Sequence, residues 1–153
     1  MRRKLIAGNW KMNGSKAQGL ALVEALAAHC REAESTAAAF DLLVCPPFVL
    51  LPVSEERARR AKIAIGGQDC HPKEAGAHTG DISATMLADV GCSYVIVGHS
   101  ERRQDHREDD ALVQAKASAA LAAGLKPIVC VGETQAERDA GQALSVIEKQ
   151  VRN

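Results

Sequence analysis

The residues best suited to chemistry follow short apolar runs that have the composition of buried strands. Asn9 and Lys11 come after the first such run, and His99 comes after the fourth. A lysine ammonium can hold a phosphate or polarise an oxygen as a compact charge. A neutral imidazole can donate a hydrogen bond to a carbonyl and transfer a proton, and the amides that begin a short helix after His99 would favour the neutral ring. Taken singly, each is more often a solvated or structural residue, but their shared position after strands favours a site.

Other polar groups have stronger structural interpretations. Glu133 follows the fifth apolar run, where a carboxylate at the start of a helix is favoured by the helix dipole in any case. His71 and His78 are seven residues apart in a long, glycine-rich loop without a carboxylate-rich ligand set, so we expect surface histidines rather than a metal site. The charged run 101–110 predicts a solvated helix start with internal ion pairs.

Five apolar runs predict strands covered on both faces, because they are continuous rather than alternating. Alanine-rich stretches between them have helical spacing, which indicates an α/β chain of right-handed βαβ units without an internal domain boundary. The pattern does not separate a closed barrel from an open doubly wound sheet. The predicted strands are 5–7, 42–44, 63–65, 94–97 and 127–131; the predicted helices are one that Ser15 caps and that buries Leu20, Val23, Leu26 and Ala27, then 55–61, 83–90, 109–123, 133–140 and 142–151.

Charge and composition narrow the classes of function. The 153 residues carry 19 Lys and Arg against 19 Asp and Glu, so nothing in the charge supports a nucleic-acid or membrane partner. No apolar run approaches the roughly 20 residues that span a bilayer, and no signal-peptide core follows the basic start. The five cysteines are widely spaced without a C-x-x-C pair, which is typical of reduced thiols. We therefore expect a cytoplasmic protein.

Several segments, in order and spacing, resemble the triosephosphate isomerase family over the whole chain. They are residues 7–14 (AGNWKMNG), the CPP turn at 45–47, and residues 76–81 (GAHTGD), 97–103 (VGHSERR) and 126–134 (KPIVCVGET). The resemblance implies an α/β fold of the TIM (β/α)₈ barrel family. With about five βα units, residues 1–153 are expected to form a single partial barrel domain that is truncated on its C-terminal side.

The resemblance implies an activity and a first set of residues. The family interconverts dihydroxyacetone phosphate and glyceraldehyde 3-phosphate by proton transfer through an enediolate, in glycolysis and gluconeogenesis, with no cofactor and no metal. By analogy, Asn9 and Lys11 bind the substrate, and Lys11 offsets the charge of the phosphate and the enediolate. His99 is implied to be the catalytic electrophile that hydrogen-bonds the substrate oxygens.

A second set of residues is implied to support these groups. Glu101 resembles a carboxylate that pairs with the lysine, and Ser100 and Cys130 resemble residues that pack around the histidine. Thr79 lies at the tip of the loop 71–81, which in this family inserts into the partner subunit of a homodimer. The expected partners are therefore a triose phosphate and a second copy of the chain.

One part of the family pattern is missing. The family's catalytic base lies after the sixth strand in a Glu-Pro-Val-Trp segment, and the only tryptophan here is Trp10. Glu133 belongs to a different strand end, so it is not expected within hydrogen-bond reach of the abstracted proton. We therefore expect this chain alone to be inactive. The alternative hypothesis is a non-catalytic fragment that self-associates through exposed sheet edges; a nucleotide-binding enzyme lacks support because no glycine-rich phosphate motif follows a strand.

Overall fold

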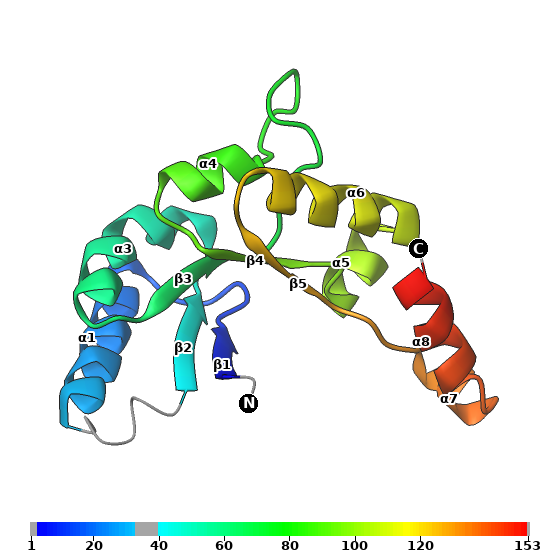
Figure 1. Ribbon diagram of the computed structural model, residues 1–153, viewed down its shortest axis with the longest axis horizontal. Coiled ribbons are helices and arrows are strands. Elements are labelled where there is room, and N and C mark those ends of the chain that lie inside the picture. Colours follow the sequence, from blue (N-terminus) through cyan, green and yellow to red (C-terminus); the bar gives the residue numbers. More distant parts are fainter. Residues whose placement is uncertain (1–2, 33–39, 153) are drawn as a thin grey trace.

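The computed structural model describes residues 3–32 and 40–152 (Figure 1). Residues 1–2 and 153, at the ends of the expected domain, and 33–39 lie outside the described part. Five strands form one parallel sheet in the order β1-β2-β3-β4-β5, so each strand pairs with the one before it in the chain. The strands are β1 (Lys4–Asn9), β2 (Phe40–Cys45), β3 (Ala64–Gly67), β4 (Tyr94–Val97) and β5 (Lys126–Val129).

Several helices begin at a residue whose side chain caps the helix N-terminus. The side chains of Ser83, Asp109 and Thr134 each accept a backbone hydrogen bond at a helix start, which satisfies an otherwise free amide. Ser15 does the same for Gln18, as predicted. The helices are α1 (Lys16–Glu32), η1 (Phe48–Leu50), α3 (Leu51–Arg60), α4 (Ala84–Asp89), α5 (Ser100–Asp105), α6 (Asp110–Ala122), α7 (Gln135–Asp139) and α8 (Ala143–Arg152).

One helix boundary differs clearly from the sequence prediction. Helix α3 begins at Leu51, four residues before the predicted start at residue 55, and the short helix η1 leads directly into it. Pro52 lies in the first turn of α3, where a missing amide proton costs no helical hydrogen bond. The proline therefore belongs to the helix instead of preceding it.

The strand order and the placement of the helices resolve the question of sheet type. Helices α1, α3, α4 and α6 lie along the outer, convex side of a curved sheet (Figure 1). A doubly wound sheet would reverse its strand order and carry helices on both faces. The sequential order seen here, with the helices outside, is instead that of a barrel wall.

The main hydrophobic core lies between this helical layer and the sheet. Val44, Val95 and Val97 point outward from the strands into it, together with Leu87 from α4 and Val113 from α6. Helix α4 packs so closely that a Cβ atom at position 67, a glycine in β3, would lie 2.6 Å from Leu87 Cδ1. Both faces of the strands are apolar, which explains why the strand sequences do not alternate.

The inner face of the sheet carries a smaller cluster. Leu43, Cys45 and Ile96 are buried there. On the outer face, Ile6 of β1, in register with Leu42, is 52% exposed, and Val129 of β5, in register with Val97, is 45% exposed. Strands β1 and β5 are the two ends of the described sheet, and each pairs with one neighbour. Apolar side chains on the outer face are thus left partly uncovered at both edges of the sheet. Over the described residues, no helix combines the length and the apolar character that crossing a membrane requires.

Candidate active site

The turn after β1 holds Lys11 in an unusual backbone conformation. Lys11 has a φ of 52°, a left-handed value that a non-glycine residue adopts only when its surroundings enforce it. The Asn9 side chain accepts a hydrogen bond from the Lys11 amide at 2.9 Å. The Trp10 amide donates to the Cys45 carbonyl at 3.1 Å. The ends of β1 and β2 therefore fix the position of the lysine.

Gln68, which follows β3, joins these two strand ends, and sequence reasoning missed its role. Its Nε2 donates to the Lys11 carbonyl at 2.9 Å and to the Cys45 carbonyl at 2.8 Å. The only signal in the sequence is that an amide follows a strand at the same rim. Gln68 thus orients the lysine turn from a third strand.

Lys11 meets Glu101, although the two are 90 positions apart in the chain. Lys11 Nζ lies 2.6 Å from Glu101 Oε1, and both side chains are about half exposed. The hydrogen bond from Lys11 holds the pKa of the Glu101 carboxyl below its usual value. The structure therefore brings together the lysine and the carboxylate that the resemblance pairs.

His99 lies at the same rim, as the residue that caps α5. Its Nδ1 accepts a hydrogen bond from the Glu101 amide at 3.3 Å, and Glu101 Oε2 is 3.5 Å from the same nitrogen. With Nδ1 accepting, the proton of a neutral ring lies on Nε2, which is then free to donate to a ligand. Glu101 therefore contacts both candidate groups, through one oxygen each.

The backbone before His99 is equally constrained. Gly98 has a φ of 68°, and a Cβ atom at this position would lie 2.7 Å from Val113 Cγ1 of α6. Arg103 Nε donates to the Gly98 carbonyl at 2.9 Å. The same guanidinium reaches the Cys130 carbonyl at 3.3 Å. Arg103 thus joins the ends of β4 and β5 behind the histidine.

Comparison with known proteins identifies the family. The family model for triosephosphate isomerase matches residues 4–153. The chain is 56% identical over 149 residues to triosephosphate isomerase of Bradyrhizobium diazoefficiens, covering 97% of this chain and 58% of that protein. It is 59% identical over 147 residues to the Ruegeria pomeroyi enzyme of the same name, covering 96% and 56%. The chain belongs to the triosephosphate isomerase family.

A solved structure agrees with this assignment. The crystal structure of triosephosphate isomerase from Bartonella henselae superposes with a TM-score of 0.90 at 44% identity, and the match covers 99% of this chain and 61% of that one. The curved sheet is therefore an arc of the (β/α)₈ barrel, as predicted, and it holds five strands. The chain spans slightly less than three-fifths of the length of the curated isomerases given above.

The other residues that the isomerase resemblance singled out lie in different surroundings. Cys130 packs against the inner cluster, and burial raises the pKa of its thiol although Arg103 opposes the shift. Ser100 is exposed at the first position of α5. Thr79 is exposed in the loop 71–81, which projects from the body of the molecule (Figure 1). Glu133 pairs with Arg138 at 2.6 Å.

A buried charge network lies behind the rim that carries Lys11 and His99, and the sequence analysis did not predict it. Lys116 of α6 is 4% exposed, and its Nζ lies 2.7 Å from Asp69 and 2.5 Å from Glu108. Arg102 of α5 contacts the same two carboxylates, at 2.9 and 2.6 Å. The prediction of a solvated run at 101–110 was therefore wrong at Glu108, which is 5% exposed. Its charge is tolerated inside because two cations neutralise it.

Burial affects the two carboxylates of this network differently. Burial raises the pKa of Asp69 above its usual value, although Lys116 and Arg102 oppose the shift. Burial also acts to raise the pKa of Glu108, but hydrogen bonds from Lys116 and Arg102 outweigh it and hold that pKa below its usual value. Glu108 is therefore the more firmly ionised member of the network.

Proposed function

We propose that the protein containing these 153 residues interconverts dihydroxyacetone phosphate and glyceraldehyde 3-phosphate by proton transfer through an enediolate. The observation that supports this most directly is the contact of Glu101 with both Lys11 and His99, at 2.6 and 3.5 Å. It gathers an ammonium and an imidazole from two strand ends at one rim. A family match over nearly the whole chain supports the same activity.

The proposed division of roles follows from the charge and the hydrogen-bonding capacity of each group. Lys11 attracts the phosphate and stabilises the enediolate as a fixed positive charge. His99 donates a hydrogen bond from Nε2 to the substrate oxygens, because its Nδ1 already accepts one from the Glu101 amide. Asn9 holds the Lys11 turn and contributes to substrate binding. An anionic substrate competes with Glu101 for Lys11, so binding exchanges one ion pair for another.

The base that abstracts the carbon-bound proton has no candidate among the rim residues described above. Glu133 follows β5, but Arg138 already engages it. We therefore propose that a polypeptide of these 153 residues does not turn over substrate by itself. The second candidate behaviour is self-association through the two sheet edges, which the exposed Ile6 and Val129 support.

The remaining family properties are also proposals for this protein. A homodimer would use the loop 71–81, with exposed Thr79 reaching toward the partner subunit. The five cysteines are all described and free, which suits the reducing cytoplasm in which glycolysis and gluconeogenesis take place.

A chimera tests the proposed activity. Residues 1–153 are joined to the part of the Bradyrhizobium diazoefficiens enzyme that this chain does not match, and triose phosphate isomerisation is measured. We expect activity in the chimera and none in the 153-residue chain. His99→Gln in the chimera should lower kcat by about 10²- to 10⁴-fold, the usual contribution of a proton-transfer group.

Two controls complete this experiment. His29→Gln replaces an exposed histidine in the last turn of α1 and should leave kcat unchanged. A folded chimera without activity, or one in which His99→Gln turns over normally, would contradict the proposal. Sedimentation of the 153-residue chain at several concentrations measures self-association separately.

A further inference from the structure

The side chain of Arg103 bridges the ends of β4 and β5 just beyond their paired residues. The Cys130 amide, directly after β5, donates to the Val97 carbonyl at 2.9 Å. Arg103 Nε donates to the next carbonyl of the β4 end, that of Gly98, at 2.9 Å, and Nη2 donates to the Cys130 carbonyl at 3.3 Å. The guanidinium therefore continues the connection between the two strands at the rim that carries His99.

A carboxylate of α6 fixes the direction of this guanidinium. Arg103 Nη1 donates to Asp110 Oδ1 at 2.7 Å, and the two side chains are only 18% and 22% exposed. Asp109 accepts the Leu112 amide at the start of α6, so the Asp110 carboxylate is not needed for that cap. Because a guanidinium carries its donors in a rigid planar fork, holding Nη1 at Asp110 also directs Nε and Nη2 toward the two carbonyls.

The Gly98 carbonyl is the contact that bears most directly on His99. It belongs to the peptide unit that joins the two residues, and a glycine places few steric limits on the rotation of that unit. A Cβ atom at position 98 would lie 3.2 Å from Arg103 Nη2, so the glycine also allows the guanidinium to approach. Anchoring the carbonyl therefore fixes the peptide plane that leads into the Cα atom of His99.

The helix after His99 is too short to fix the histidine by itself. Helix α5 has six residues, and helices of this length are marginal without tertiary contacts because nucleation is costly. The Arg103 amide donates to the His99 carbonyl at 3.0 Å, so the residue that closes the first turn also reaches back to β4 and β5. The Glu101 amide, which donates to His99 Nδ1 at 3.3 Å, lies within that turn. Loosening the turn would release Nδ1, and with it the tautomer in which Nε2 is the donor.

We propose that Arg103, oriented by Asp110, is a positioning residue for His99 in the proposed isomerisation, on which this role rests. It acts through the Gly98 carbonyl and the first turn of α5, and it holds the ring in the orientation and tautomer in which Nε2 donates to the substrate oxygens. A lysine would keep the charge but could not hold two carbonyls and a carboxylate in one plane. Misplacement of a reacting group by about 1 Å can cost about 10²-fold in rate, so the fork matters more than the charge.

A double-mutant cycle in the chimera tests this role. Arg103→Lys should lower kcat about 10- to 100-fold with KM unchanged, but by less than about twofold when His99→Gln is already present. A residue that only holds the fold together would lower kcat by the same factor in both backgrounds. Arg57→Lys is the matched control, because Arg57 also contacts a carboxylate and a backbone carbonyl, at 2.9 and 3.4 Å, but on the exposed surface of α3. It should leave kcat unchanged, and circular dichroism checks the fold of each variant.

The ring of His99 gives a second readout that does not depend on activity. Nitrogen-15 NMR of the 153-residue chain at about pH 8, where an ordinary imidazole is neutral, reports which ring nitrogen carries the proton. The signal is assigned by its loss in His99→Gln. We expect the Nε2-protonated tautomer in the parent and in Arg57→Lys, and a mixture of the two tautomers in Arg103→Lys.

The two measurements separate the role of Arg103 from the activity on which it rests. A parent chimera without activity would contradict the proposed function, and the tautomer of His99 then decides the role of Arg103 alone. If Arg103→Lys does not fold, Asp110→Ala takes its place and should give the same pattern at a smaller amplitude, because both carbonyl contacts remain. An equal fall in kcat with and without His99→Gln, a rise in KM at constant kcat, or an unchanged ring tautomer would each overturn the positioning role.

Discussion

Two lysines in this chain each contact a carboxylate from a distant segment, but in opposite environments. Lys116 lies among Asp69 and Glu108 with 5% of its side chain exposed. Lys11 meets Glu101 at a similar distance, with about half of each side chain in water. Removing one partner from a buried pair leaves an uncompensated charge inside the protein, whereas exposed pairs contribute little to stability.

The difference separates a lysine with a structural role, Lys116, from Lys11, whose proposed role is chemical. The buried network joins the loop after β3 to α5 and α6, and so supports the helix that begins just after His99. The exposed pair is built on a left-handed lysine backbone, which costs conformational energy with no large gain from the ion pair. Such a cost is expected where the side chain serves binding or catalysis.

The largest expected effect is on the buried side of this comparison. Lys116→Met should lower the free energy of unfolding by about 3–5 kcal/mol, because Asp69 and Glu108 lose a shared cation. Urea denaturation measures it. Lys16→Met, at the exposed start of α1, is the matched control and should be nearly neutral. Equal stability of the two variants would show that the network contributes no more than a surface lysine.

A smaller effect is expected from Glu108→Gln, and it should depend on pH. At neutral pH the loss of two charge-assisted hydrogen bonds should cost about 1.5–3 kcal/mol. The pKa of Glu108 is lowered by folding, so its contribution is present above the usual value of 4.5 and is lost as the pH falls below it. The difference in unfolding free energy between the parent and Glu108→Gln should therefore narrow below pH 4.5.

Unfolding free energies of both proteins across this acid range test the prediction. Asp69, whose pKa is raised, contributes with the opposite sign, but it is present in both proteins and its contribution largely cancels. Glu56→Gln, which removes a surface pair with Arg60 on α3, serves as the control and should give only a small gap at neutral pH. A gap for Glu108→Gln that is constant down to pH 3 would contradict the lowered pKa.

The smallest effect on stability is expected at the exposed pair. Lys11→Met should leave the urea midpoint of the 153-residue chain unchanged within the scatter of replicates, because water screens this contact. The same substitution in the chimera should abolish most of the isomerase activity. If the urea midpoint instead falls as far as in Lys116→Met, the contrast between the two lysines fails.

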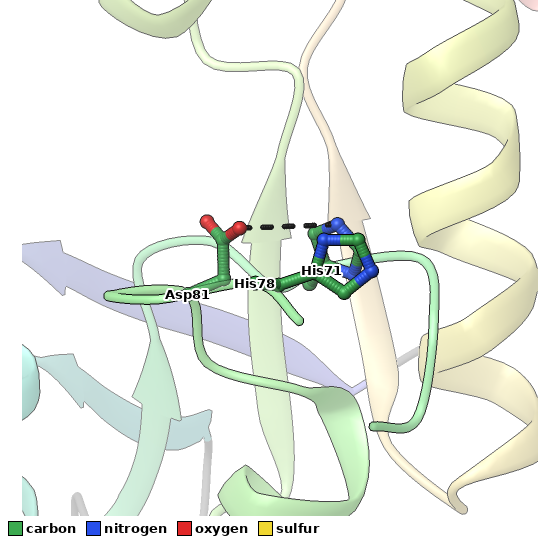
Figure 2. A group of neighbouring side chains, drawn as sticks. All are labelled: His71, His78 and Asp81. Carbon is green, nitrogen blue, oxygen red and sulfur yellow. Dashed lines mark ion pairs between the residues drawn. The ribbon is translucent and has the colours of Figure 1, made fainter. Parts of the chain in front are cut away.

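Much of this architecture could be predicted from the sequence, but its long-range polar contacts could not. Continuous apolar runs located all five strands, and the family motifs located Lys11, His99 and Glu101. Glu108 was misplaced because a run of charged residues is normally solvated, and its burial depends on cations at 102 and 116. The contacts of Gln68 with the ends of β1 and β2 likewise depend on the fold, as do those among His71, His78 and Asp81 in the loop 71–81 (Figure 2). Local pattern carries no information about such pairings.

The consecutive strand order also bears on how the chain is made. Each new strand pairs with the strand synthesised just before it, so the sheet can grow in the direction in which the ribosome releases the polypeptide. At every stage the newest strand is the template for the next one, and no finished strand has to be separated to admit a later one. Vectorial synthesis and the final arrangement thus follow the same sequence of events.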